Sequence, residues 1–325
     1  MRVDDIELTW SHGRATVNPA AGMLREAHLR DGDTWVSPFA SPAWLRDDPL
    51  LEPGLLRELG AEFACVPFGS AAVPPKAPPG WRSTPAQQHP HGPTANLPWT
   101  VVERSPSRVV MQLELAEPNA VARVTRVVEG VEGEPCLAFA LTVQSRRDHR
   151  SSLGLHPIFR LPAVGETLDV DAQFTEGRTY PVAIEGGSHL LAVDRSFSSL
   201  GDVGGIDISR LPFAERAEEI VQLLDARSPL RLHWSNGDSV SLEWDAAVLP
   251  SVLLWIADRQ LSEAPWNRTY RGLGVEPIAS AFDLPPEVSA APNPLRASGH
   301  RTAVELFASA PLELTYRVTA KHGMN

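Results

Sequence analysis

Apolar and polar residues alternate with a period of two along much of this chain, and this pattern constrains the fold more than any other feature. It is clearest in residues 230–234 and 240–244, where leucine, valine and tryptophan occupy every second position. Asn236-Gly237 lies between these stretches, and this dipeptide tolerates the positive φ angles of a tight hairpin turn. The sequence therefore predicts an antiparallel β-hairpin here.

Further stretches have a composition typical of strands: residues 108–115, 121–128, 137–143, 253–256, 303–308 and 312–318. Residues 212–224 are the best candidate helix, although residues 220–224 fit a strand equally well. The chain has 30 prolines in 325 residues, and proline breaks helix interiors. A helical bundle is therefore disfavoured, and we predict an all-β protein, a large antiparallel sandwich.

Nine of the prolines lie between residues 67 and 99, where neither strand nor helix periodicity survives. Such a stretch is either a linker between domains or a functional loop. Residues 65–68 and 99–102 resemble strands of one sheet system, so we favour the loop and expect residues 1–325 to form a single domain. Residues 285–298 form a second stretch that is expected to be irregular.

The net charge of −11 argues against binding to nucleic acid or to anionic membranes, since both need a basic surface. Cys65 and Cys136 lie in apolar stretches and are expected to be buried free thiols. The first ten residues carry acids where a signal peptide has an apolar stretch. Residues 248–257 are too short to span a membrane. We expect a cytoplasmic protein with neither a nucleic-acid nor a membrane partner.

Three short segments contain candidate chemistry. His156 lies in Leu-Gly-Leu-His-Pro-Ile-Phe, and a histidine can exchange a proton near neutral pH. Glu276 lies in Leu-Gly-Val-Glu-Pro, and a glutamate is rarely buried without a partner. His91-Gly92 belongs to the proline-rich stretch, where His89-Pro-His91 is only a weak metal motif. Taken alone, the His156 and Glu276 segments favour a structural role in the core, and His91-Gly92 says little about function.

Taken in order, these segments resemble those of the aldose 1-epimerase (galactose mutarotase-like) family. That family has an early His-Gly, a central His-Pro-Tyr-Phe-Asn-Leu segment and a late strand ending in Glu-Pro. The counterparts here are His91-Gly92, His156-Pro-Ile-Phe159-Arg-Leu161 and Gly274-Val-Glu276-Pro277. The resemblance covers nearly the whole chain. It implies a large antiparallel β-supersandwich of the galactose mutarotase-like type, which interconverts the α and β anomers of an aldose.

Carried over to this sequence, the resemblance implies that Glu276 is the general base, His156 the general acid and His91 a sugar-binding residue. Opening a cyclic hemiacetal needs one proton removed from the anomeric hydroxyl and one given to the ring oxygen, which a carboxylate and an imidazolium can do. We expect no cofactor, no metal, a small sugar as partner and a monomer or homodimer. Trp255 is a candidate platform for the sugar's apolar face.

This sequence departs from the family pattern in its sugar-binding residues. Ile158 and Arg160 stand where the family has Tyr and Asn, and the family's early Asn-Arg pair has no counterpart. Arg160 and Arg82 are candidate substitutes for that pair. The family's intermediate acidic residue has three candidates: Glu218, Glu219 and Asp225.

Three alternatives stay open. One is a hexose-6-phosphate mutarotase, whose phosphate would need an arginine cluster such as the one around His156: Arg146, Arg147, Arg150 and Arg160. Another is a non-catalytic carbohydrate-binding protein on the same fold. The third is glycosidase-like chemistry, which needs two well-placed carboxylates.

Overall fold

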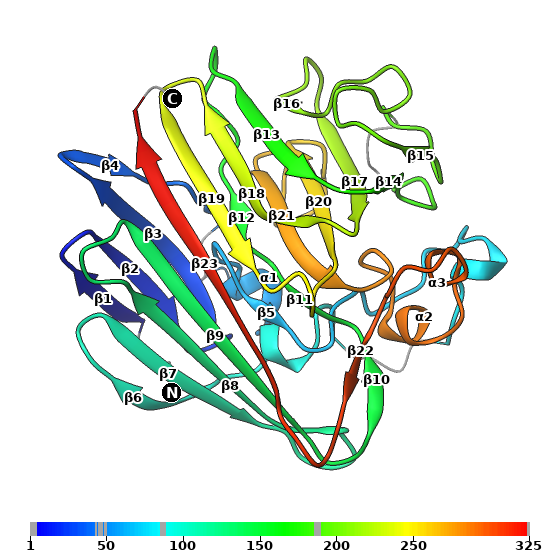
Figure 1. Ribbon diagram of the computed structural model, residues 1–325, viewed down its shortest axis with the longest axis horizontal. Coiled ribbons are helices and arrows are strands. Elements are labelled where there is room, and N and C mark those ends of the chain that lie inside the picture. The colour runs from blue at the N-terminus through cyan, green and yellow to red at the C-terminus, as the bar shows by residue number, and fades with distance from the viewer. Residues whose placement is uncertain are drawn as a thin grey trace.

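Two large antiparallel sheets packed face to face form the centre of the molecule (Figure 1). The computed structural model describes residues 5–42, 44, 48, 51–84, 89–184 and 190–323. Strands predominate in this part of the chain, and every pairing between the named strands is antiparallel. The predicted all-β class is confirmed. The expectation that the chain forms one domain stays a prediction.

The first large sheet has nine strands, and its order places the predicted hairpin near its middle. In that hairpin, Leu230 pairs with Leu242 and Leu232 pairs with Val240, and Gly237 in the turn has a φ of 93°. The hairpin prediction is therefore confirmed. The strands in spatial order are β16 (Arg210–Leu211), β13 (Leu168–Gln173), β18 (Arg227–Trp234), β19 (Asp238–Trp244), β23 (Leu312–His322), β9 (Cys136–Ser145), β8 (Val121–Gly130), β7 (Arg108–Glu114) and β6 (Thr100–Arg104).

The second large sheet has eight strands and carries the candidate site. Its order is β15 (Ser196–Phe197), β14 (Glu176–Thr179), β17 (Ala217–Leu224), β20 (Ser251–Asp258), β21 (Arg271–Ala279), β11 (Leu153–Leu155) and β5 (Ala64–Cys65), with β12 (Ile158–Phe159) also paired to β21. Cys65 in this sheet and Cys136 in the other are buried free thiols, as expected.

Smaller elements surround the two sheets. A four-stranded sheet contains β1 (Ile6–Trp10), β2 (Gly13–Asn18), β3 (Met23–Asp31) and β4 (Thr34–Val36). A two-stranded sheet pairs β10 (His149–Ser151) with β22 (Val304–Leu306). The helices are α1 (Leu55–Glu58), α2 (Pro286–Ala290) and α3 (Pro294–Ala297), with 3-10 turns η1 (Pro79–Trp81) and η2 (Pro93–Ala95).

Some local expectations are wrong. Residues 212–224 contain no helix, because β17 takes its apolar residues into the middle of the eight-stranded sheet; the strand alternative for residues 220–224 is correct. Residues 285–298 are not wholly irregular, since α2 and α3 lie there and proline occupies the first turn of each. By contrast, the two C-terminal stretches form strands as predicted, β22 paired with β10 and β23 paired with β19 and β9.

The two faces of the eight-stranded sheet bury different side chains. Because successive residues of a strand point to opposite faces, Leu254 and Val275 enter the core between the two large sheets. Leu253 and Ile278 point the other way and pack in a second core beneath the proline-rich segment and the helices. This outer face of the sheet carries the candidate chemistry.

Candidate active site

Strands β20 and β21 place two predicted site residues on the outer face of the eight-stranded sheet. Trp255 pairs with Gly274 and Leu253 pairs with Glu276, so Trp255 and Glu276 share a face. Glu276 is 1% exposed, although a glutamate is rarely buried so fully. The face of the sheet thus presents a buried carboxyl beside a tryptophan ring.

His156 reaches Glu276 because its segment runs beside β21. Its backbone N–H donates to the carbonyl of Phe63 at 2.8 Å, and its ring stacks on the Phe63 ring at 4.3 Å. Nε2 of His156 lies 3.3 Å from Oε1 of Glu276, and the two side chains are only 7% and 2% exposed. The structure therefore brings the two residues together, as the sequence motifs predicted.

Gly274 leaves room for the Glu276 carboxylate. A Cβ atom at position 274 would lie 2.3 Å from Oε1 of Glu276, closer than any real contact allows. The φ angle of Gly274 is not positive, so the absence of a side chain is needed for space and not for backbone conformation. The glycine two residues before Glu276 is thus part of the site's shape.

The proline-rich segment contributes His91. Its ring lies perpendicular to the His156 ring at 5.0 Å and contacts Phe63 and Phe68 edge-on. Its backbone N–H donates to the Gly69 carbonyl at 2.7 Å. Gly92 follows with a φ of 73°, which brings the segment against strand β5 without a Cβ in the way. Residues 85–88 of this segment lie outside the described residues.

Trp255 connects the pair to an acidic residue on β17. Its Nε1 donates to Oε1 of Glu218, and its ring stacks on Tyr270 at 5.7 Å and meets His156 edge-on at 5.9 Å. Of the three candidates for the intermediate acid, Glu218 is the one whose described contacts reach this site.

Glu219 and Asp225 lie elsewhere. Glu219 is on the other face of β17 and accepts from the backbone N–H of Leu190, whereas Asp225 binds Thr175 and His300.

Several solved structures have the same arrangement of strands. An aldose epimerase homologue from C. elegans has a TM-score of 0.65 at 15% identity, covering 99% of both chains. A galactose mutarotase-like protein from Lactobacillus casei has a TM-score of 0.61 at 16% identity, covering 98% of this chain and all (100%) of the other. A third, a galactose mutarotase-like protein from Clostridium acetobutylicum, has a TM-score of 0.63 at 13% identity and covers 98% and 95%.

The chain has the galactose mutarotase-like fold. No protein-family model and no curated protein matches the sequence. The likeness thus lies in the strand arrangement over the whole length, while few residues are identical. At this level of identity, the galactose mutarotase-like fold alone does not assign catalytic or binding roles to individual residues.

Sequence reasoning missed a second polar group beside the pair. After β21 the chain turns, and Gln222 holds the turn by donating to the Ser280 carbonyl and accepting from the Phe282 N–H. This turn carries Asp283, which is hydrogen-bonded to Tyr180 and close enough to Glu276 to raise its pKa. Asp283 carries the same sequence signal as Glu276, a single acid between apolar residues. Unlike Glu276, it belongs to no recognised motif.

Burial shifts the protonation of the pair in opposite directions. It raises the pKa of Glu276 well above its ordinary value, and the Asp283 carboxylate raises it further. Burial also lowers the pKa of His156 well below its ordinary value, with a smaller contribution from His91. Both shifts disfavour charge, so burial favours a protonated Glu276 carboxyl beside a neutral His156 imidazole. The two groups then share one titratable proton, which lies on Glu276.

The neighbouring groups follow the same rule. Burial lowers the pKa of His91 to about 4. Burial raises the pKa of Glu218 to about 8, and the Glu219 and Asp283 carboxylates add to this while the Trp255 hydrogen bond opposes it. In this buried site, ionisation of these groups therefore costs free energy unless a ligand supplies hydrogen bonds to the charged form.

Neither predicted arginine contacts the pair. Arg160 lies where β12 has ended, so its guanidinium leaves the sheet, binds Asp238 at 2.7 Å and covers the Trp234 ring at 4.7 Å. Arg82 is exposed, and its Nε donates to the Ala77 carbonyl at 2.6 Å. The described contacts of both arginines lie away from the pair, and their role as substitutes for the family's Asn-Arg pair stays a prediction.

Within the described residues, every helix lacks the length and apolar character needed to cross a bilayer. Over the same ranges, no group of three or more His, Cys, Asp and Glu side chains is arranged to hold a metal ion. The prediction that the reaction needs no metal or cofactor stays a prediction.

Proposed function

We propose that this protein is an aldose 1-epimerase that interconverts the α and β anomers of an aldose through Glu276 and His156. The observation that carries the proposal is the 3.3 Å contact between Nε2 of His156 and Oε1 of Glu276 in a buried site. A carboxyl and an imidazole at this distance exchange a proton easily. The galactose mutarotase-like fold supports the proposal without deciding the activity.

Throughout the reaction, Glu276 and His156 together hold one transferable proton. With the pair ionised, the Glu276 carboxylate takes the proton of the anomeric hydroxyl, and the His156 imidazolium gives its proton to the ring oxygen. The bond between C1 and the ring oxygen breaks, its electron pair goes to that oxygen, and C1 becomes a carbonyl carbon. Rotation about C1–C2 and reversal of both transfers close the other anomer. The raised pKa of Glu276 and the lowered pKa of His156 favour the neutral form of the pair, which is the form that ring opening produces.

Unpaired buried polar atoms around the pair fit a polyhydroxylated ligand. Four of them lack a hydrogen-bond partner among the described residues: Nδ1 of His91, Nδ1 of His156, the hydroxyl of Tyr270 and Oδ1 of Asp283. An unsatisfied buried group costs about 1–3 kcal/mol. Sugar hydroxyls can both donate and accept. Binding of an aldose would therefore satisfy groups that the closed site leaves unpaired.

A neutral sugar suits this site better than a sugar phosphate. Glu218, Glu276 and Asp283 face the same buried region, where burial disfavours charge and raises the pKa of each carboxyl, and a phosphate dianion would meet the same desolvation cost. Because the His156 and Glu276 side chains are almost fully buried, the side chains that cover them must move before a sugar can reach the pair. The hexose-6-phosphate alternative therefore finds no support in the contacts described here.

The test is the rate at which anomers equilibrate, followed by NMR exchange spectroscopy or polarimetry. We expect the protein to accelerate exchange of glucose or galactose, and to act less well on glucose 6-phosphate. Glu276→Gln should lower kcat/KM about 10²–10⁴-fold, the usual contribution of a general acid or base. Glu219→Gln is the matched control, a buried acid on the opposite face of β17, and should retain activity.

Sugar binding without any acceleration would instead support the non-catalytic alternative. Acceleration that survives Glu276→Gln and His156→Ala unchanged would refute the assignment of the pair.

A further inference from the structure

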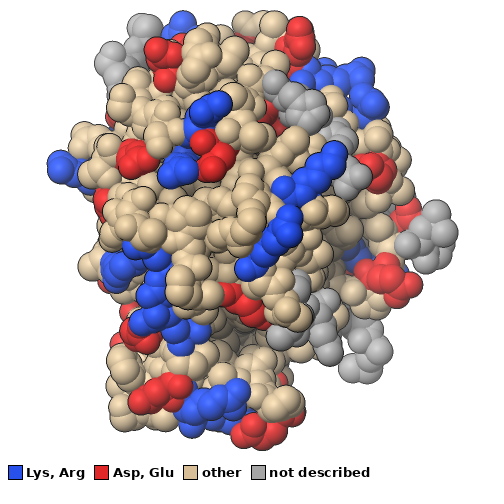
Figure 2. Space-filling view, turned by 90° about the vertical axis from the view of Figure 1, so that its right-hand side faces the viewer, with Lys and Arg blue, Asp and Glu red and all other residues tan. Residues whose placement is uncertain are grey.

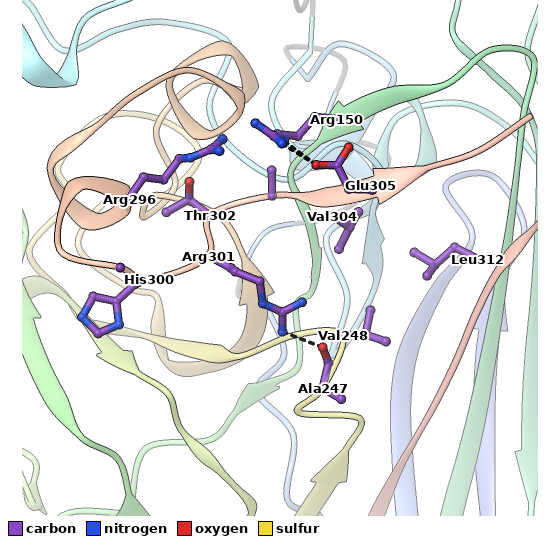
Figure 3. A pocket seen from close by; sticks show the side chains of 12 residues that line it. Arg150, Ala247, Val248, Arg296, His300, Arg301, Thr302, Val304, Glu305 and Leu312 are labelled. Carbon is purple, nitrogen blue, oxygen red and sulfur yellow. Dashed lines mark hydrogen bonds and ion pairs between the residues drawn. The ribbon is translucent and has the colours of Figure 1, made fainter.

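A separate cavity of about 470 Å³ lies where the two-stranded sheet meets α3 (Figure 3). Three arginines from three segments line it: Arg150 from β10, Arg296 from α3 and Arg301 from the loop before β22. In Figure 3 the guanidinium groups of Arg150 and Arg296 point toward one another across its upper part. Neither His156 nor Glu276 lines this cavity.

Backbone carbonyls hold two of these guanidinium groups without neutralising them. Arg296 donates from one terminal nitrogen to the Ala290 carbonyl at 2.9 Å, and Arg301 donates to the Ala247 carbonyl at 2.6 Å. In the described part of the chain, neither forms an ion pair with a carboxylate, whereas Arg150 binds Glu305 at 2.7 Å through Nε. A guanidinium has five N–H donors. Each therefore keeps donors for a ligand.

The remaining charged groups do not cancel this charge. His300 also lines the cavity, but it is paired with Asp225 at 3.1 Å and approaches Glu176 at 3.9 Å. Figure 2 views the face that is on the right in Figure 1 and shows acidic and basic side chains in small groups scattered over it. Among the described residues, the cavity thus holds two guanidinium groups without a carboxylate partner, while the Glu305 carboxylate that also lines it is paired with Arg150.

We propose that this cavity binds the phosphate group of a small phosphorylated metabolite. The planar guanidinium matches phosphate oxygens with paired N–H bonds. The terminal oxygens of a phosphate monoester can accept from Arg150 and Arg296, whose guanidinium groups face one another, while Arg301 adds positive charge at the lower side of the cavity (Figure 3). The volume lies in the range of small-ligand sites, about 300–1,000 Å³, and leaves room for an organic group beside the phosphate.

The cavity is also connected to the turn that carries Asp283. Arg296 binds the last residue of α2, and Ser289 of α2 accepts from the Ala281 N–H at the end of β21. This contact path joins the phosphate site to the segment beside Glu276. The proposal concerns binding alone and stands whether or not the protein is an epimerase.

Isothermal titration calorimetry at constant ionic strength tests it, with inorganic phosphate, glucose 6-phosphate and adenosine 5′-monophosphate as probes. We expect saturable binding of at least one probe, weakened at least tenfold by Arg296→Gln and by Arg301→Gln. Arg210→Gln removes an exposed arginine that pairs with Asp169 and should bind as the wild type does. Glu276→Gln should also retain binding, which separates this site from the epimerase.

The probes identify the source of the phosphate. Preference for glucose 6-phosphate indicates a sugar phosphate, preference for the nucleotide indicates a nucleoside phosphate, and equal binding indicates that the phosphate alone is recognised. Absence of saturable binding at millimolar concentrations of all three would overturn the proposal. So would unchanged affinity in both folded arginine variants, with folding checked by thermal unfolding.

Discussion

At the scale of single residues, the site gathers ionisable groups that burial keeps neutral. Glu218 shows the consequence most clearly, because its carboxyl is buried, receives the Trp255 N–H and has a pKa raised to about 8. Glu276 and Asp283 shift in the same direction. An unfolded chain ionises these carboxyls at much lower pH, so the groups that equip the site also make its stability depend on pH.

Glu218→Gln is expected to stabilise the protein progressively from pH 4.5 to about 8. Below pH 4.5, the usual value for a glutamate, the carboxyl is protonated in both states and costs nothing. Between the two values the unfolded chain loses the proton while the folded chain keeps it, so the free energy of unfolding falls as pH rises. Glutamine does not titrate and can still accept from Trp255.

Thermal unfolding of both proteins across this range measures the effect. The midpoints should agree at acid pH and separate as pH rises, with the variant higher by several degrees at pH 8. A constant difference at every pH would contradict the raised pKa.

At the scale of elements, neighbouring strands determine how Glu276 and His156 meet. Strand β12 pairs with β21, so Ile158 stands opposite Gly274, and the Val275 N–H donates to the Pro157 carbonyl at 3.0 Å. This pairing carries His156 to Glu276 although 120 residues separate them in the chain. The absence of a side chain at position 274 then decides where the carboxylate lies.

Gly274→Ala should therefore abolish most epimerase activity while the sheet still folds. The added methyl group occupies the place of Oε1 of Glu276 and must push the carboxylate away from His156. A displacement of about 1 Å can cost about 10²-fold in rate. The matched control is Gly201→Ala, where a Cβ would meet only the Ser199 hydroxyl at an ordinary 3.5 Å. Full activity in Gly274→Ala would show that the carboxylate position is not critical.

The strands and the pair were predictable from the sequence because both depend on local pattern. Alternation marks strands, and short motifs around His156 and Glu276 resemble a known family. The places of Arg160 and Asp283 were not predictable, since they depend on partners distant in sequence. Arg160 meets Asp238 across 78 residues, and Asp283 lies in a turn that Gln222 of another strand holds through hydrogen bonds. No periodicity encodes such pairings.

At the scale of the whole molecule, one buried ionic group joins the sheets. Glu62 precedes β5 of the eight-stranded sheet and binds Arg126 of β8 and Tyr316 of β23 in the nine-stranded sheet. Its backbone also pairs with Leu24 of the four-stranded sheet. Phe63, the next residue, accepts the His156 N–H and stacks on its ring. The packing of three sheets thus supports the position of His156.

Glu62→Gln is expected to destabilise the protein by about 3–5 kcal/mol, because it leaves the Arg126 charge buried and unpaired. Glu62 and Arg126 are 0% and 1% exposed. Urea unfolding measures the difference. The control is Glu114→Gln, which removes an exposed ion pair with Arg123 and should cost less than about 1 kcal/mol. Equal effects of the two substitutions would show that the buried group adds nothing to stability.

The most direct test of the pair is a comparison of anomer exchange rates among the wild type, Glu276→Gln, His156→Ala and the double variant. If the two side chains work as one proton-transfer unit, each single substitution should remove most of the acceleration. The double variant should then be scarcely slower than either single variant, since residues that act together are not additive. Single variants that exchange anomers as fast as the wild type would show that the Glu276–His156 contact is structural and that the chemistry lies elsewhere.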